Sequence, residues 1–248
     1  MRCLTDVAMR RRAAWLLLAT VLGVGLALRL GFWQLDRAAR KVALQERLDS
    51  RRAMPPLGDR DLPTTVDAAS MQHFRRVVLH GRWLADRTVF LDNRQMNGAP
   101  GFFVVTPLEL ADGARAVAVQ RGWAPRDFLD RAALPAVLTP SGPVEVQGLI
   151  APPPARLYEF APAGSGPIRQ NLDLAAYAQE LRTPLLPFSV LESPSPSTAG
   201  DGLRREWPLP ALDVDRHYGY AFQWFALGAL ITGLYVWFQL VRPHRHRV

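Results

Sequence analysis

The feature that most constrains this chain is a run without charged residues near its C-terminus, residues 218–241. A helix of this length measures about 36 Å, enough to cross a hydrocarbon core of roughly 30 Å with some tilt. A helix satisfies its own backbone hydrogen bonds in lipid, so helix is the expected structure. Tyrosines and tryptophans lie toward both ends of the run, as in helices anchored at two membrane interfaces.

A second apolar run, residues 13–33, lies near the N-terminus and would form a helix of about 31 Å. Its one charged residue, Arg29, has a side chain long enough to extend to the interface. The run also fits a signal peptide, because Gly25 and Ala27 offer a cleavage site with small residues. The pattern continues without a break into residues 34–41, which favours an uncleaved anchor.

The net positive charge of the chain belongs mainly to its two ends. The twelve N-terminal residues carry four arginines and the C-terminal tail three more, out of a net charge of +8. The positive-inside rule therefore puts both termini in the cytoplasm and the central domain outside, although basic residues also follow the first run. No basic patch on a folded domain is visible, so nucleic acid is not a predicted partner.

The central residues, 34–216, predict a β-rich domain. Short runs of alternating or apolar residues, separated by Gly, Pro and Asn, are typical of a mostly antiparallel sheet or a partial barrel. Residues 34–52 favour a helix that continues the first span until Pro55 and Pro56 end it. A short helix is expected at 171–181, capped by Asn171 or Asp173, and a loop or linker at 192–202.

The predicted fold class is therefore a membrane protein of α+β type. Transmembrane helices at 13–33 and 217–241 flank the extramembrane domain at 34–216. Small residues recur at four-residue spacing in both runs, which lets helix backbones approach closely and favours a helix pair. They are Ala19, Gly23 and Ala27 in the first run, and Gly228 with Thr232 and Ala229 with Gly233 in the second.

The domain shows no catalytic constellation, and an enzyme is not predicted. Cys3 is the only cysteine, which excludes an internal disulfide and cysteine-based copper transfer. No HExxH, GxSxG or glycine-rich phosphate loop occurs. We interpret Arg121 and Trp123, in QRGWAP, as residues at a strand end, with the tryptophan in the core and the arginine bonded locally. These patterns favour a binding or scaffolding surface.

The two helices carry the more informative side chains. An imidazole, flat aromatic rings and arginines at a lipid–water boundary suit a haem, through iron ligation, ring contact and propionate pairing. The same residue types also favour this boundary simply as anchors, and both readings stay open. The candidates are His217, Tyr220 and Trp224 on the second helix, and Arg29, Trp33 and Arg37 on the first.

Four stretches in order are together similar to the surfeit locus protein 1 family of cytochrome c oxidase assembly factors. They are LGFWQLDRAARK, VFLDNRQMNGAPGFFVVTPLEL, VQRGWAPRD and HYGYAFQWFALGALITGLYVWF. The resemblance covers nearly the whole chain. One departure is Gln120, where the family leads us to expect Asn before RGW.

The resemblance implies a bacterial inner-membrane protein with a periplasmic central domain. It further implies that the protein binds haem a and assists its insertion into the catalytic subunit of haem–copper oxidase. His217 would be the ligand of the haem iron, and the family's Trp-Gln and following Arg fall on Trp33, Gln34 and Arg37. The implied partners are oxidase subunit I, haem a synthase as a second candidate, and the lipid bilayer. The alternative is a scaffold that stabilises an oxidase intermediate without haem.

Overall fold

The computed structural model describes residues 2–127, 129–130, 133–158, 166–207 and 214–242. The chain forms two compact units, which we treat separately. The helical unit comprises Met1–Arg47 and Ala211–Val248, and the barrel unit comprises Leu48–Pro210.

Two long helices make up the helical unit. Helix α1 (Arg2–Ala53) is continuous, which confirms that residues 34–52 extend the first apolar run. Helix α4 (Val214–Val236) ends in a π-helical turn at Trp237–Val241. Both contain a stretch long and apolar enough to cross a membrane. Their outward faces expose large apolar side chains, which suits lipid: Trp15, Leu22, Phe222, Leu230 and Trp237.

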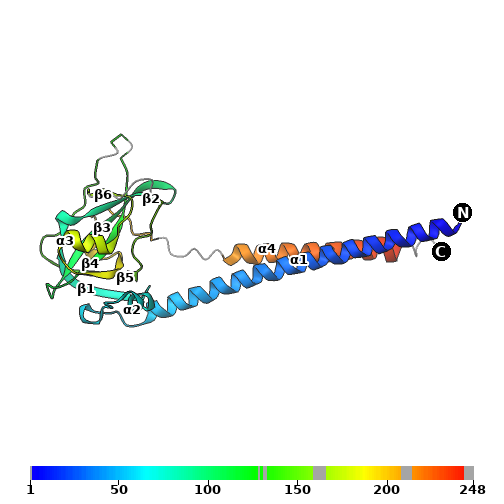
Figure 1. Cartoon of the computed structure of the whole chain (residues 1–248), viewed down its shortest axis with the longest axis horizontal. Helices are drawn as coiled ribbons and strands as arrows, with labels where there is room; N and C mark the ends of the chain where they lie inside the picture. The colour runs from blue at the N-terminus through cyan, green and yellow to red at the C-terminus, as the bar shows by residue number, and fades with distance from the viewer. Residues whose placement is uncertain (1, 128, 131–132, 159–165, 208–213, 243–248) are drawn as a thin grey trace. The chain divides into compact units, whose positions relative to one another are not determined.

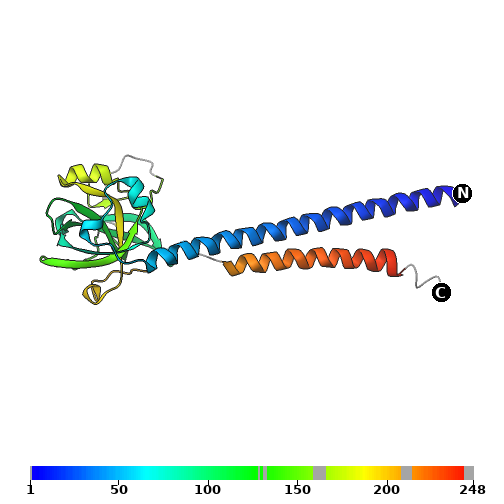
Figure 2. The ribbon, with the colours of Figure 1, turned by 90° about the horizontal axis from the view of Figure 1, so that it is seen from below.

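Helices α1 and α4 lie side by side and antiparallel (Figures 1 and 2). Buried or half-buried residues recur along each helix at steps of three and four, the spacing of a coiled-coil seam. We call these two rows the helix seam. Its residues are Thr20, Val24, Ala27, Gly31, Gln34 and Ala38 on α1, and His217, Ala221, Trp224, Gly228, Ile231 and Tyr235 on α4.

Small residues bring the two backbones together within the helix seam, as the sequence predicted. A Cβ built on Gly228 would lie 3.6 Å from the Cβ of Ala27, and one built on Gly23 would lie 3.7 Å from Ile231. The expectation holds for Gly23, Ala27 and Gly228 and was wrong for the other small residues, which are exposed: Ala19, Ala229, Thr232 and Gly233.

The barrel unit is built on five strands that close on themselves in the order β1-β5-β7-β4-β3, with β3 pairing back to β1 (Figure 1). These are β1 (Arg76–Trp83), β3 (Ala99–Leu110), β4 (Ala116–Pro125), β5 (Pro143–Ala151) and β7 (Leu185–Glu192). Strands β2 (Val89–Met96) and β6 (Ile168–Arg169) extend the sheet from β3. All pairings are antiparallel except β4–β7 and β2–β6. The predicted mostly antiparallel sheet is confirmed, and it closes.

Short helices complete the unit. They are α2 (Val66–Met71), α3 (Leu174–Leu181) and the 3-10 turns Asp59–Asp61, Ala85–Arg87 and Pro196–Thr198. Asp173 is the N-cap of α3, because its carboxylate accepts hydrogen bonds from the N–H groups of Ala175 and Ala176. Asn171, the other predicted cap, instead bonds the main chain of Leu157.

The barrel interior is filled by apolar side chains from all five strands, among them Leu79, Leu108, Val119, Ile150 and Phe188. Trp123 is fully buried, as interpreted from the sequence, and its indole N–H donates to the carbonyl of Arg94 over 2.9 Å. Burial of the indole ring removes a large apolar area from water, and its hydrogen bond fixes the orientation of the ring.

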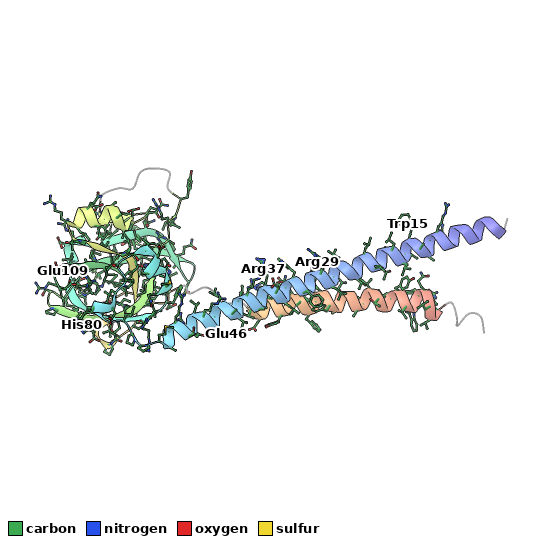
Figure 3. All side chains as sticks on the ribbon, turned by 60° about the horizontal axis from the view of Figure 1, so that its bottom comes forward. Trp15, Arg29, Arg37, Glu46, His80 and Glu109 are labelled. Carbon is green, nitrogen blue, oxygen red and sulfur yellow. The ribbon has the colours of Figure 1, made fainter. Side chains whose placement is uncertain are left out.

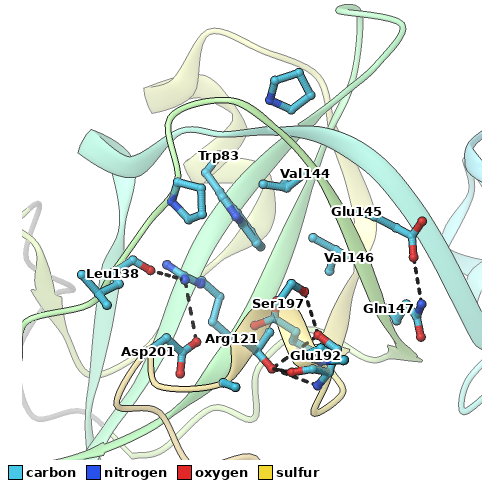
Figure 4. A pocket seen from close by; sticks show the side chains of 16 residues that line it. Trp83, Arg121, Leu138, Val144, Glu145, Val146, Gln147, Glu192, Ser197 and Asp201 are labelled. Carbon is cyan, nitrogen blue, oxygen red and sulfur yellow. Dashed lines mark hydrogen bonds and ion pairs between the residues drawn. The ribbon is translucent and has the colours of Figure 1, made fainter.

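Arg121 occupies a β-bulge. On β3, Val104 pairs with Gly122 and Val105 pairs with Gln120, so Arg121 is the extra residue of β4. A bulge bends its strand and changes the direction of the side chain at that point. The Arg121 guanidinium is thereby directed into the opening between β4 and the N-terminal half of β5 (Figure 4).

Barrel closure depends on a glycine. Gly81 faces Leu110 where β1 meets β3, and a Cβ at this position would lie 2.1 Å from the carbonyl oxygen of Glu109. We expect Gly81→Ala to lower the free energy of unfolding of the barrel by about 1–3 kcal/mol. Urea unfolding of the full chain in detergent, followed by tryptophan fluorescence, measures this loss. Gly142→Ala, which meets nothing within 4 Å, is the control, and equal stability of the two variants would contradict the prediction.

Candidate functional site

The candidate ligand, His217, lies in the helix seam opposite α1. Its Nδ1 is 2.8 Å from Oε1 of Gln34, and both side chains are half-buried. An amide oxygen only accepts hydrogen bonds, so Nδ1 is the donor in this contact. The pair joins residues 183 positions apart because both occupy seam positions of antiparallel helices.

The other candidates on α4 divide between the seam and its flank. Trp224 is half-buried at a seam position, two helical turns from His217. Tyr220 is 46% exposed beside the seam. The predicted shared face of His217, Tyr220 and Trp224 therefore exists, with the two aromatic rings at different depths.

The candidates on α1 lie outside the seam. Trp33 is 49% exposed, and the guanidinium of Arg37 lies 4.8 Å from its ring centroid. Arg29 and Trp33 line a shallow hollow of about 780 Å³ with Leu30 and Phe32. Figure 3 shows Arg29 and Arg37 extending from α1.

Arg29 and Arg37 differ in their relation to His217. At about 100° per residue, Arg37 lies about 60° around α1 from Gln34, whereas Arg29 lies about 140° away. Both arginines are exposed. Helical geometry therefore brings Arg37 and Trp33 toward the flank of the His217–Gln34 contact, and it does not bring Arg29 there.

The residues around His217 fit a haem in their chemistry. A metal-binding histidine characteristically donates its second ring N–H to an oxygen acceptor, which fixes the ring, and Gln34 supplies that acceptor here. Exposed aromatic faces at Tyr220 and Trp33 can cover a macrocycle, and the Arg37 cation can pair with a carboxylate.

Next to the His217–Gln34 contact, aromatic packing fixes how α4 lies against α1. Phe32 and Phe225 form an edge-to-face pair with ring centroids 5.3 Å apart. Gly31 lies under the Phe225 ring, where an added Cβ would come within 2.6 Å of it. The absence of a side chain at Gly31 is therefore what lets Phe225 enter the seam.

The barrel holds a second notable group of side chains, which we call the ionic cluster: Arg121, Glu192, Asp201 and Arg205. Arg205 bonds Glu192 over 2.9 Å and also donates to Asp201. Arg121 donates to Thr139 Oγ1 over 2.6 Å and to the carbonyl of Leu138 over 2.7 Å. All four side chains are nearly inaccessible, at 4–9% exposure.

Burial and charge act in opposite directions in the ionic cluster. Burial raises the pKa of Glu192, although Arg205 and Arg121 oppose the increase. Burial alone would also raise the pKa of Asp201, but hydrogen bonds from Arg205 and from the Leu203 N–H bring it below its ordinary value. Burial lowers the pKa of Arg121, and the two carboxylates oppose that. A buried ion pair of this kind is stable only while every partner is present.

Sequence reasoning missed the ionic cluster. Arg121 was interpreted as bonded locally, which the contacts to Leu138 and Thr139 confirm. Glu192 and Asp201 lay at the ends of the segment read as a loop or linker. The signal in the sequence was a turn-rich segment that holds two acidic residues, Glu192 and Asp201, and is closely followed by Arg204 and Arg205.

The ionic cluster borders a cavity of about 680 Å³ in the barrel unit (Figure 4). Its walls include Trp83, whose ring centroid lies 4.8 Å from the Arg121 guanidinium, and the N-terminal half of β5. Within the described ranges, no three His, Cys, Asp or Glu side chains are grouped to hold a metal ion.

The chain matches a known protein family over most of its length. Residues 21–229 match the sequence profile described as the SURF1 family. The chain belongs to this family. The match begins in the first apolar run and ends in the second, so it includes part of each long helix, the whole barrel and the haem-site candidates on both helices.

Individual relatives of this SURF1 family member agree. A SURF1-like protein of Drosophila melanogaster is 26% identical over 228 residues, 86% of this chain and 73% of the relative. A SURF1-like protein of Rickettsia bellii is 28% identical over 226 residues, 83% of each chain. The cytochrome oxidase assembly protein SHY1 of Saccharomyces cerevisiae is 31% identical over 96 residues, 38% of this chain and 24% of the yeast protein. The family resemblance inferred from the sequence is confirmed.

The contact between Gly31 and Phe225 can be tested by disulfide formation elsewhere in the helix seam. Ala27→Cys and Gly228→Cys place two thiols at a spacing that suits a disulfide, since the relevant Cβ distance is 3.6 Å. With Cys3 replaced by Ser, this pair should oxidise readily in the membrane-embedded chain. Adding Gly31→Leu should reduce the yield several-fold, because the new side chain displaces Phe225.

The yield is measured by alkylating the remaining thiols with a polyethylene-glycol maleimide and counting the shifted bands. Gly25→Leu is the matched control, because nothing lies within 4 Å of that glycine. Equal disulfide yields in the Gly31→Leu and Gly25→Leu chains would rule out this seam.

The ionic cluster predicts a pH-dependent loss of stability. Arg205→Met leaves Glu192 and Asp201 buried without their shared cation, which should cost about 3–5 kcal/mol of unfolding free energy near pH 7. In this variant, the pKa values of both carboxylates in the folded state rise above their unfolded values. Ionisation of either carboxylate then lowers the free energy of unfolding. The deficit relative to wild type should therefore shrink as the pH falls toward about 4.5.

Urea unfolding at several pH values tests this. Arg204→Met is the control: Arg204 is exposed and lies 5.5 Å from the Trp123 ring, a contact worth about 0.5–1 kcal/mol. A deficit for Arg205→Met that stays constant with pH would contradict the assignment.

Proposed function

We propose that this chain is a non-catalytic assembly factor for haem–copper cytochrome c oxidase, anchored in the bacterial inner membrane by α1 and α4. Membership of the SURF1 family and similarity to a yeast relative named as a cytochrome oxidase assembly protein support the role in oxidase assembly. Two helices long and apolar enough to cross a membrane support the anchoring. Arginines at both chain ends favour cytoplasmic termini and a periplasmic barrel.

The more specific part of the proposal is that the chain binds haem a through His217 and helps insert it into oxidase subunit I. One observation carries this part: the 2.8 Å contact between His217 Nδ1 and Gln34 Oε1 in the helix seam. A histidine kept only as an interface anchor has no need of a half-buried acceptor on the neighbouring helix. Such an acceptor is the arrangement that prepares the opposite ring nitrogen for a metal.

The chain's own residues would act as follows. Gln34 accepts a hydrogen bond from Nδ1 and holds the imidazole plane, and Nε2 is the ring nitrogen that would bind iron. Arg37, stacked on Trp33, presents a cation for a propionate carboxylate at the membrane boundary. When bound, haem a supplies the redox-active iron and the macrocycle that the oxidase requires.

Assembly requires release as well as binding. A single histidine ligand supported by hydrogen bonding, rather than by a closed cage of ligands, allows haem to be passed on to subunit I. The acceptor would approach at the exposed side of Tyr220 and Trp33, which the helix seam leaves uncovered. Haem a synthase is the second candidate partner, as a donor.

The testing experiment compares haem content in the wild-type chain and three variants, all purified from cells that make haem a. We expect His217→Ala to lose most of its haem by pyridine-haemochrome analysis. We expect Gln34→Ala to weaken haem affinity by roughly 10–100-fold, because losing the hydrogen-bond acceptor of a metal-binding histidine has an effect of this size. His80→Ala, which changes an exposed histidine in the barrel, is the control and should retain wild-type haem.

Oxidase subunit I co-purification is measured on the same preparations. Haem loss with subunit I retained supports haem binding as one function within the assembly role. Equal haem content in wild type and His217→Ala would exclude His217 as the ligand. No haem in any chain, with subunit I still bound, would favour the alternative of a scaffold that stabilises an oxidase intermediate.

A further inference from the structure

Strand β5 has an edge that its neighbours leave partly open. Glu145 lies opposite His80 in the antiparallel β1–β5 pair. The His80 N–H donates to Asp59 Oδ1 over 2.9 Å, and its carbonyl accepts from the Ala111 N–H over 2.9 Å. Both main-chain groups of His80 therefore point away from β5. In an antiparallel pair, two opposed residues either bond each other through both main-chain groups or both turn these groups outward. His80 turns its groups outward, so the N–H and C=O of Glu145 point away from β1.

The open edge has clear limits. Farther along β5, residues 148–151 pair with β7, and the carbonyl of Gln147 accepts a hydrogen bond from the Ser193 N–H over 2.8 Å. Strand β7 then ends, and Pro194 turns the chain away. In the part of the chain that the structure describes, no main-chain hydrogen bond reaches Glu145 from this edge. Its N–H and C=O are thus available to an added strand.

This edge forms one side of the cavity shown in Figure 4. Val144 and Val146 of β5 give it an apolar wall, Arg121 and Trp83 lie at its base, and residues 195–199 face β5 from the other side. Its volume of about 680 Å³ falls within the range of about 300–1,000 Å³ that is usual for ligand sites. The cavity therefore has both main-chain groups and apolar contacts for an extended segment.

Charge indicates what kind of segment fits. The ionic cluster has two arginines and two carboxylates and is balanced, so its contribution to the cavity is neutral. Glu145 adds a carboxylate at the rim with a side chain 51% exposed. Gln147 donates to it over 2.8 Å, and His80 Nε2 lies 3.6 Å away. The accessible charge is negative, which complements a Lys or Arg side chain.

We infer that this cavity binds a short, extended, basic segment of a partner polypeptide, which adds as a strand to the edge of β5 beside Glu145. Strand addition of this kind draws affinity from main-chain hydrogen bonds and specificity from side-chain pockets. Pro143 begins the strand, and Pro194 and Pro196 lie on the opposite wall. Prolines shorten the usable edge, which favours a short segment over edge-to-edge pairing of two copies of this chain.

The experiment uses the full chain in detergent and a phage library of random heptapeptides. Wild-type protein selects peptides, and Glu145→Pro protein removes those that do not need the edge. Proline at position 145 removes the outward N–H and the carboxylate but no hydrogen bond of the β1–β5 ladder, because this residue makes none with β1, so the difference between Glu145→Pro and Glu145→Gln reports the N–H. We expect proline-free peptides with Lys or Arg. Their affinity should fall about tenfold or more with Glu145→Pro, and severalfold with Glu145→Gln, which keeps the N–H and loses the charge.

Two controls keep folding separate from binding. Asp86→Asn, which changes another exposed carboxylate of the barrel unit, should bind as wild type. Methylating the backbone nitrogens of a selected peptide tests the same hydrogen bonds without changing the protein, and should also abolish binding. Failure to select any peptide that distinguishes wild type from Glu145→Pro overturns the inference. So does tight binding of the methylated peptide, or a dimer of the wild-type chain that Glu145→Pro dissociates.

Discussion

The packing of Phe225 over Gly31 is the constraint on which the helical unit depends. A ring can enter the helix seam only where the facing helix carries no side chain, and an added Cβ would lie 2.6 Å from it. That contact fixes how far one helix slides along the other. The slide in turn determines which residue of α1 faces His217, and the answer is Gln34. The polar contact between His217 and Gln34 thus depends on an apolar contact two turns of α4 away.

In the barrel unit, a glycine and a β-bulge set the geometry. Closure of β1 on β3 needs Gly81, and a bulge in β4 turns Arg121 into the opening that remains. Buried arginines require buried carboxylates, which are Glu192 at the end of β7 and Asp201 on the segment that follows it. The same segment faces the free part of β5. One ionic cluster therefore secures the loop that shapes the neighbouring cavity.

Much of this could be predicted from sequence because the signals were periodic. Uncharged runs gave the two long helices, small residues gave part of their seam, and alternating strands gave a mostly antiparallel sheet. Strand β7 was missed because LLPFSVLE contains a proline and does not alternate. The Gln34–His217 contact and the ionic cluster were missed for another reason. Each joins residues far apart in the chain, and only the register of a helix pair or the closure of a sheet brings them together. Helical spacing grouped Arg29 with Trp33 correctly, but not with His217.

The aromatic residues of α1 and α4 set a length scale for the surroundings. Trp15 and Trp33 are separated by about 27 Å along α1, and Tyr220 and Trp237 by about 26 Å along α4, at 1.5 Å per residue. All four are exposed on antiparallel neighbours, so the two helices define one apolar slab of matched thickness. A bilayer with a thicker hydrocarbon core could be matched only by thinning around the pair, while a thinner one would make both helices tilt together. The thickness of a surrounding bilayer would thereby set the tilt of the helix pair that carries the His217–Gln34 contact.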